Sequence, residues 1–341
     1  MKSRSRTLCC LLAASVVLLL FLNLCFGTVK VPLRAVIAAI TGGTAENAVW
    51  NFIVLQSRLP SALTAILAGA SLSASGLMLQ TTFRNPLAGP DILGINGGAS
   101  LGVAIVMMLF GGSIPAGATT LGAGISIIAG AFVGAIAVTG IILALSVRLK
   151  RPVTLLIAGI MVSYLASSVI SLLNFFSTSE GVHSYVMWGM GNFGGVSMSR
   201  MPVFATAAAI GLATAILLIK PLNALLLGDF YAENLGIKTK RVRTLLLLST
   251  GILTAVTTAF CGPVSFIGLA VPHIARLLLK NGNHRSLMPV TILAGMCIAL
   301  LCNMISAIPG DRGLIPLSAV TPLVGAPVII WVLLKGRDIN Q

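Results

Sequence analysis

The sequence predicts an all-α, polytopic membrane protein with about ten transmembrane helices in a single domain covering residues 1–341. Apolar residues make up 57% of the chain and charged residues only 9%, and the mean hydropathy is +1.04, far above that of an ordinary soluble domain. Glycine, alanine and serine recur at helical spacing within the apolar runs, as in helices that pack closely in lipid. Ten stretches are long enough, or nearly so, to cross a bilayer: residues 8–27, 61–80, 92–110, 121–147, 153–176, 202–219, 243–261, 264–280, 287–308 and 321–335.

Two of these boundaries depend on short signals. The first 27 residues resemble a secretory signal in their basic start, but the apolar run is long enough to span and no small-x-small cleavage site follows it. We therefore expect a retained first span. The seventh and eighth stretches are separated only by Gly262 and Pro263, which we expect to break the helix.

Basic residues indicate the orientation in the membrane. With ten spans both termini lie on one side, and that side carries 17 of the 22 lysines and arginines. The positive-inside rule then places both termini in the cytoplasm. The net charge of +15 is thus a topology signal, and we expect no nucleic-acid partner. The opposite side carries five basic residues: Lys30, Arg34, Arg58, Arg200 and Arg312.

Two classes of active transporter fit poorly. None of the seven acidic residues lies in the middle of a predicted span, whereas ion-coupled secondary transporters usually carry an ionisable group there. The chain also lacks the GxxxxGK[ST] phosphate loop, so the usual ATPase chemistry is missing. Energy for uphill transport would have to come from a partner protein, and the ion-coupled transporter stays as an alternative.

One motif suggests an enzyme. GASLG at residues 98–102 matches the GxSxG pattern of a hydrolase nucleophile elbow, with Ser100 as nucleophile. It lies near the start of an apolar stretch, and His273 is better explained as a polar residue satisfied at a helix end. An intramembrane protease is the second alternative, but we expect no catalytic residue. The six cysteines show no CxxC spacing, so we expect no metal site.

The longest basic interruption covers residues 220–243 and reads as two short helices with a bend. Pro221 suits the start of the first helix, and Gly228 its end. Asp229 can cap the second helix, and Gly236 can close it. Helices this short need neighbours to be stable.

Several sequence blocks occur together in one order between residues 57 and 335. They are SRLP at 57–60, RNPLAGP at 84–90, WGMG at 188–191, the loop at 228–236, GPVSFIGL at 262–269 and GAP at 325–327. The chain resembles the FecCD family, the permease subunits of type II ABC importers for iron–siderophore complexes, haem and vitamin B12.

This resemblance implies a ten-helix subunit of the bacterial inner membrane that dimerises around a central pathway, most simply with an identical copy. Two ATPase subunits would dock on the cytoplasmic side and bind ATP, and a periplasmic or lipid-anchored solute-binding protein would dock on the other. The chain itself would be no enzyme and would need no cofactor. We expect an iron–siderophore complex as substrate, with vitamin B12 or haem as the alternative.

The resemblance also implies sites. Residues that would contact the ATPase are Gly228, Asp229, Ala232, Leu235 and Gly236, with Asp229 fixing the start of the short helix and Ala232 giving close approach. The inner gate would involve Asn85 and Leu87. Docking of the binding protein would use Arg58, with Arg200 and Arg312 as further candidates.

Three positions depart from the family pattern. Ser61 replaces a frequent second arginine, and Asn303 and Ala307 stand where an aspartate and an arginine are common in the ninth span. Fewer charges are therefore expected on the outer face.

Overall fold

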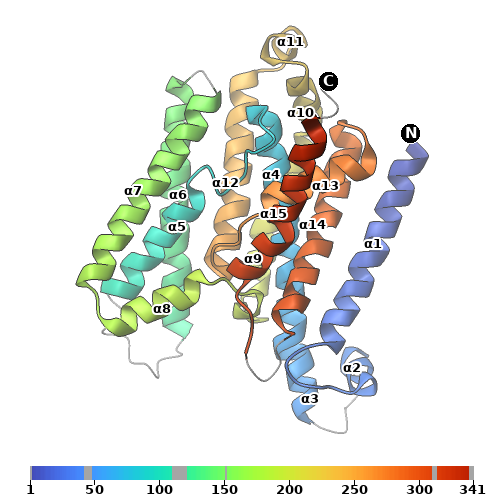
Figure 1. Cartoon of the computed structure of the whole chain (residues 1–341), viewed down its shortest axis with the longest axis vertical. Coiled ribbons are helices and arrows are strands. Elements are labelled where there is room, and N and C mark those ends of the chain that lie inside the picture. The colour runs from blue at the N-terminus through green and yellow to red at the C-terminus, as the bar shows by residue number, and fades with distance from the viewer. Residues whose placement is uncertain (1, 42–47, 110–120, 150–151, 309–312, 338–341) are drawn as a thin grey trace.

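The computed structural model describes residues 2–41, 48–109, 121–149, 152–308 and 313–337, and all regular structure within these ranges is helical (Figure 1). The all-α prediction is confirmed. The α-helices are α1 (Lys2–Cys25), α2 (Leu33–Ile40), α3 (Ala48–Phe52), α4 (Leu59–Phe83), α5 (Ile95–Ala104), α6 (Leu121–Arg148), α7 (Pro152–Phe176), α8 (Ser179–Gly189), α9 (Met201–Leu217), α10 (Ile219–Leu226), α11 (Asp229–Asn234), α12 (Thr239–Cys261), α13 (Ile267–Leu279), α14 (His284–Ser306) and α15 (Leu317–Arg337).

Each of the ten predicted stretches contains an apolar helix. Among the described residues, six helices are long and apolar enough to span a membrane, and α9 with α10 forms a seventh span bent by 50°. Shorter apolar helices cover Ile95–Met108, Ile267–Leu279 and Leu317–Trp331. Helix α1 begins and α15 ends at the end of the bundle that carries α11 (Figure 1), as an even number of spans requires.

Helix α4 lies at the centre of the bundle, and α9, α12, α13 and α14 pack around it. Small residues make this possible. A Cβ atom on Gly69 would lie 2.3 Å from the carbonyl oxygen of Gly295 in α14, and one on Gly76 would lie 1.6 Å from that of Gly268 in α13. The backbones therefore touch directly, as expected of helices that associate in lipid.

The helix that contains α4 begins earlier than predicted. It starts with α3 at Ala48, and a π-helical segment, Ile53–Arg58, connects α3 to α4 without a break. The predicted span began only at residue 61. Pro60 has no N–H to donate to the carbonyl of Gln56, as a regular α-helix would require. A local π turn accommodates such a proline inside a membrane helix.

The GASLG segment lies within α5 and serves helix packing. A Cβ atom on Gly102 would lie 2.0 Å from the carbonyl oxygen of Gly130 in α6, and one on Gly98 would lie 2.5 Å from that of Gly134. Turns precede α5, whereas a nucleophile elbow requires a strand before the serine. The geometry around Ser100 therefore does not support the protease alternative.

Two short connections were not predicted as helices. Helix α2 lies with α3 at the end of the bundle opposite α11, and α8 crosses the foot of α5, α6 and α7 (Figure 1). Thr178 caps α8 by accepting a hydrogen bond from the amide of Gly181. Both helices fall between the predicted spans, where hydropathy carries no signal.

We expect Gly76→Ala to destabilise the chain by about 1–3 kcal/mol, because the added methyl group would overlap the carbonyl oxygen of Gly268. The melting temperature of the detergent-purified chain would report this loss. The matched control is Gly140→Ala, because a Cβ atom there meets nothing within 4 Å. Equal melting temperatures for the two variants would contradict the close-packing interpretation.

Candidate coupling site

The polar segment at residues 220–243 forms the tip of the bundle, built from α10, α11 and the start of α12 (Figure 1). Two predicted helix ends are confirmed: Gly228 has φ +116° and Gly236 has φ +80°, and both follow the last turn of a helix. The first helix begins two residues earlier than predicted, at Ile219, since it follows α9 directly through a bend at Leu218.

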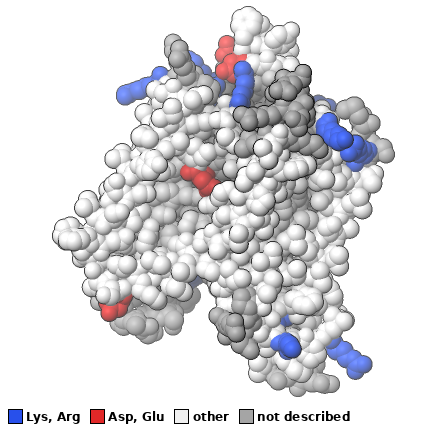
Figure 2. Space-filling model, viewed as in Figure 1, with Lys and Arg blue, Asp and Glu red and all other residues white. Residues whose placement is uncertain are grey.

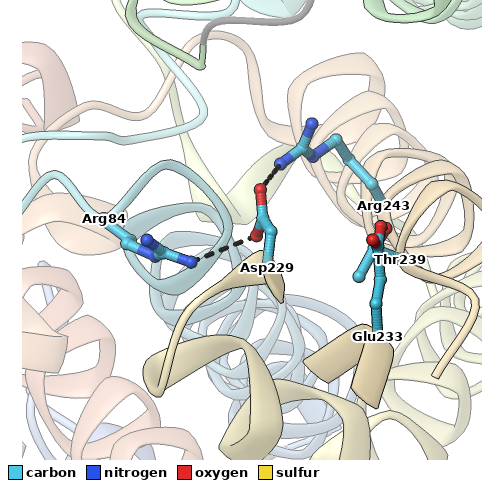
Figure 3. A network of polar contacts seen from close by, with 5 residues as sticks. All are labelled: Arg84, Asp229, Glu233, Thr239 and Arg243. Carbon is cyan, nitrogen blue, oxygen red and sulfur yellow. Dashed lines mark hydrogen bonds and ion pairs between the residues drawn. The ribbon is translucent and has the colours of Figure 1, made fainter. Parts of the chain in front are cut away.

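The expected role of Asp229 needs correction. Gly228 is the N-cap of α11, and Asp229 is the first residue of the helix and makes no capping bond. Its carboxylate instead pairs with two arginines (Figure 3): Arg84 Nη2 lies 3.1 Å from Oδ1, and Arg243 Nη2 lies 3.1 Å from Oδ2. Asp229 therefore fixes the position of α11 through α4 and α12.

These ion pairs matter more for geometry than for stability. The side chains of Asp229 and Arg84 are about half exposed, and exposed pairs contribute roughly 0.2–1 kcal/mol. Arg84 ends α4 with a left-handed backbone, φ +46°, and directly precedes Asn85. The carboxylate thus joins α11 to the segment predicted to form the inner gate.

A second contact closes the other end of α11. The hydroxyl of Thr239 at the start of α12 donates a 2.6 Å hydrogen bond to Glu233 Oε1 (Figure 3). Asp229 and Glu233 thus bind the two ends of one short helix to the same neighbour, α12. This explains how a six-residue helix is held in place, since it would not form alone.

Ala232 is fully buried, so its expected contact with the ATPase also needs correction. Its side chain lies in an apolar cluster with residues of α10 and α12, including Leu222, Leu225, Val242 and Leu246. A small residue here lets α11 lie close to its own neighbours. Besides the polar residues Glu233 and Asn234, α11 and the residues flanking it expose large apolar and aromatic side chains, which were not predicted apart from Leu235. The exposed side chains, which we term the tip surface, are Leu226, Leu227, Phe230, Tyr231 and Leu235.

The predicted gate residues lie in a loop between α4 and α5. Asn85 Oδ1 accepts a 2.9 Å hydrogen bond from the amide of Leu87, and the Leu87 side chain is exposed. His273 Nε2 donates to the carbonyl of Pro86 at 2.8 Å. This confirms that the histidine is satisfied by hydrogen bonding, but it lies in the middle of α13 and not at a helix end. The gating role of Asn85 and Leu87 stays a prediction.

Helix α13 is bound to α4 by a further polar pair that sequence spacing could not reveal. Arg276 Nη1 donates a 2.6 Å hydrogen bond to Gln80 Oε1, and Gln80 Nε2 donates to the carbonyl of Leu269 at 3.1 Å. The two side chains lie 196 residues apart in the sequence. The gate loop is therefore held from both α11 and α13.

Arg58 lies at the opposite end of the bundle and is only 8% exposed. Its guanidinium donates to the carbonyls of Leu24 (2.7 Å), Cys25 (2.8 Å) and Val29, and so satisfies the free carbonyls at the end of α1. Its docking role stays a prediction. Arg200 precedes α9 and is engaged within the chain, and Arg312 lies outside the described residues.

Two of the departures from the family pattern, Ser61 and Asn303, belong to an uncharged hydrogen-bond chain beside Arg58. Ser61 Oγ donates to Asn303 Oδ1 at 3.1 Å, and Asn303 Nδ2 donates to Asn23 Oδ1 at 2.9 Å. These residues line a cavity of about 190 Å³ together with Arg58. The outer end of α1 is therefore joined to α4 and α14 by neutral groups.

Comparison with known proteins decides the family. A family model described as the FecCD transport family matches residues 15–335. The chain belongs to the FecCD transport family. It is therefore a permease subunit of an ABC importer and a multi-pass inner-membrane protein.

Curated relatives cover most of the chain. The vitamin B12 import system permease BtuC of Klebsiella pneumoniae is 34% identical over 318 residues, covering 93% of this chain and 90% of that protein. BtuC of Citrobacter koseri is 36% identical over 287 residues, covering 84% of each. The chain is therefore similar over most of its length to proteins named as vitamin B12 import permeases.

Solved structures support the type II importer permease fold. A structure described as an inward-facing conformation of a metal-chelate type ABC transporter is 28% identical, with a TM-score of 0.83 and coverage of 97% of this chain and 99% of that chain. PsaBC from Streptococcus pneumoniae, in complex with Fab, is 14% identical with a TM-score of 0.50, a likeness of fold only.

We expect Asp229→Asn to lower the ratio of substrate transported to ATP hydrolysed at least about fivefold, because the neutral side chain loses both ion pairs and coupling energies of this kind start near that size. Transport and hydrolysis measured together in proteoliposomes give the ratio. Glu180→Gln is the control, because it removes an acidic residue in the first turn of α8, far from the tip. An unchanged ratio in Asp229→Asn would contradict the hypothesis that the Asp229–Arg84 ion pair couples α11 to the rest of the permease.

Proposed function

We propose that this chain is the permease subunit of an importer for vitamin B12 or a closely related corrinoid. The observation that carries the proposal is the match to vitamin B12 import permeases at 34–36% identity over 84–93% of the chain. This reverses the order of the sequence-based expectation, which placed iron–siderophore complexes first. A metal chelate is the second candidate, supported by the structural neighbour of the metal-chelate type at 28% identity.

Two ATPase subunits would supply the energy by docking on the tip. The tip surface offers exposed aromatic and leucine side chains on a protruding element, and buried aromatic anchors commonly dominate interface energies. Closure of the ATPase pair would move α10 and α11 together, since they pack on one another. The motion then reaches residues 84–94 through the Asp229–Arg84 ion pair and alternates access to a pathway shared with a second copy of this chain.

The tip end would face the cytoplasm. That side carries 17 of the 22 basic residues in the ten-span arrangement, and α1 begins and α15 ends at the tip end. A periplasmic or lipid-anchored binding protein would then dock at the opposite end, near Arg58 and the cavity beside it.

Removal of one aromatic anchor tests the docking surface. We expect Phe230→Ala to weaken binding of the ATPase subunit at least about tenfold, because its side chain is 77% exposed at the tip. Binding of the purified ATPase to the permease in nanodiscs would be measured. Phe52→Ala is the matched control, since Phe52 is 67% exposed in α3 at the other end. Equal affinities would mean that α11 is only a connector.

Uptake by the reconstituted complex tests the substrate. We expect ATP-dependent accumulation of labelled cobalamin in proteoliposomes containing the permease, its ATPase and its binding protein, and weaker or no accumulation of ferric siderophores and haem. Accumulation of a siderophore without cobalamin would favour the second candidate. Transport driven by a proton gradient without the ATPase would contradict the proposed energy source.

A further inference from the structure

A basic cavity of about 490 Å³ lies at the tip end of the bundle, where the start of α1 meets the turn between α13 and α14. Three cationic side chains line it: Arg4, Lys280 and Arg285. Four amide or hydroxyl side chains complete its polar lining, and none of its described lining residues is acidic. Figure 2 shows basic side chains gathered over this turn. The cavity is therefore suited to an anion.

Local hydrogen bonds define the turn that lines the cavity. Lys280 ends α13 in a left-handed conformation, φ +50°, which turns the chain sharply. Asn281 Oδ1 then accepts a 3.0 Å hydrogen bond from the amide of Asn283, and Asn283 Oδ1 accepts one of 2.9 Å from the amide of Arg285. Arg4 Nη2 donates to the carbonyl of Leu278 at 3.2 Å, which fixes α1 against this turn.

An apolar surface adjoins the cavity. Leu277 and Leu278, in the last turns of α13, are 38% and 40% exposed. Within the spanning window of α1 only 17% of the residues are buried by the rest of the chain, so the other helices cover α1 sparsely. A ligand in the cavity would thus have cationic groups around its head and an exposed apolar surface beside it.

We propose that this cavity binds the phosphodiester headgroup of an anionic phospholipid, such as phosphatidylglycerol or cardiolipin, from the adjoining leaflet. Basic pockets between membrane helices on the cytoplasmic side recognise such headgroups. Guanidinium groups match phosphate oxygens geometrically. The adjoining leucines favour a lipid over a soluble phosphate, which shares the same anion chemistry.

The same turn also anchors the coupling helix α10. Asn223 Nδ2 donates to Asn283 Oδ1 at 3.1 Å, and Asn223 Oδ1 accepts from the amide of His284 at 2.8 Å. A bound headgroup would stabilise the turn and, through Asn223, the position of α10. This consequence for transport rests on the proposed function, whereas the lipid site itself does not.

Native mass spectrometry of the full chain, with phosphatidylglycerol and phosphatidylcholine in competition, tests the site without ATPase or substrate. We expect the wild-type chain to retain phosphatidylglycerol preferentially. The variant Arg4→Gln, Lys280→Gln, Arg285→Gln should lose that preference at least about tenfold, since each basic residue near the membrane surface adds to anionic lipid binding. The matched control, Lys238→Gln, Lys240→Gln, Arg241→Gln, removes three charges elsewhere at the tip end and should keep it.

Other results would overturn the proposal. No lipid preference in the wild-type chain, the same preference in the triple variant, or the same loss in the control would each do so. Inorganic phosphate that competes as well as phosphatidylglycerol would identify a soluble anion as the ligand. If the triple variant fails to fold, Arg4→Gln with Lys280→Gly keeps the test decisive, because glycine suits the left-handed backbone, and the wild-type preference should also fall as salt is raised.

Discussion

Contact between backbones, with almost no side chain between them, is the constraint on which this bundle depends. In lipid no hydrophobic force draws helices together, so their association relies on close packing and on hydrogen bonds that water does not weaken. Helix α4 meets this condition on two sides, through Gly69 against α14 and Gly76 against α13. Its central position follows, and with it the positions of the loop that leaves its end and of the helices that surround it.

Polar groups are placed where this close packing ends. Gln80 and Arg84 lie in the last turn and at the cap of α4 and bind α13 and α11, respectively. In the proposed mechanism, movement of α11 would therefore act on the end of the most tightly packed helix, and not on a free loop. A half-exposed ion pair would then matter for transport although it contributes little to stability.

The membrane architecture could be predicted from the sequence because hydropathy and length are local properties, and each of the ten expected spans contains an apolar helix. The helical continuation from α4 back to Ala48 could not be predicted, because a proline such as Pro60 normally interrupts a helix. Here the π-helical segment Ile53–Arg58 keeps the helix continuous. The partners of Asp229 were also beyond reach, because Arg84 lies 145 residues away and spacing alone favours a cap. Ala232 was expected to face the ATPase, but it is buried against α10 and α12. The sequence cannot show which side of a six-residue helix is buried, because that depends on neighbours distant in the chain.

Arginines hold both ends of α1, a helix that the rest of the chain covers sparsely. Arg58, directly before α4, binds the carbonyls at the last turn of α1, and Arg4 in the first turn of α1 binds the carbonyl of Leu278. Hydrogen bonds at both ends of α1 allow it to tilt together with the helices that it contacts but oppose sliding along its own axis. During a transport cycle α1 would therefore move together with α4, α13 and α14. Its exposed side would report the rotation of these helices as one group.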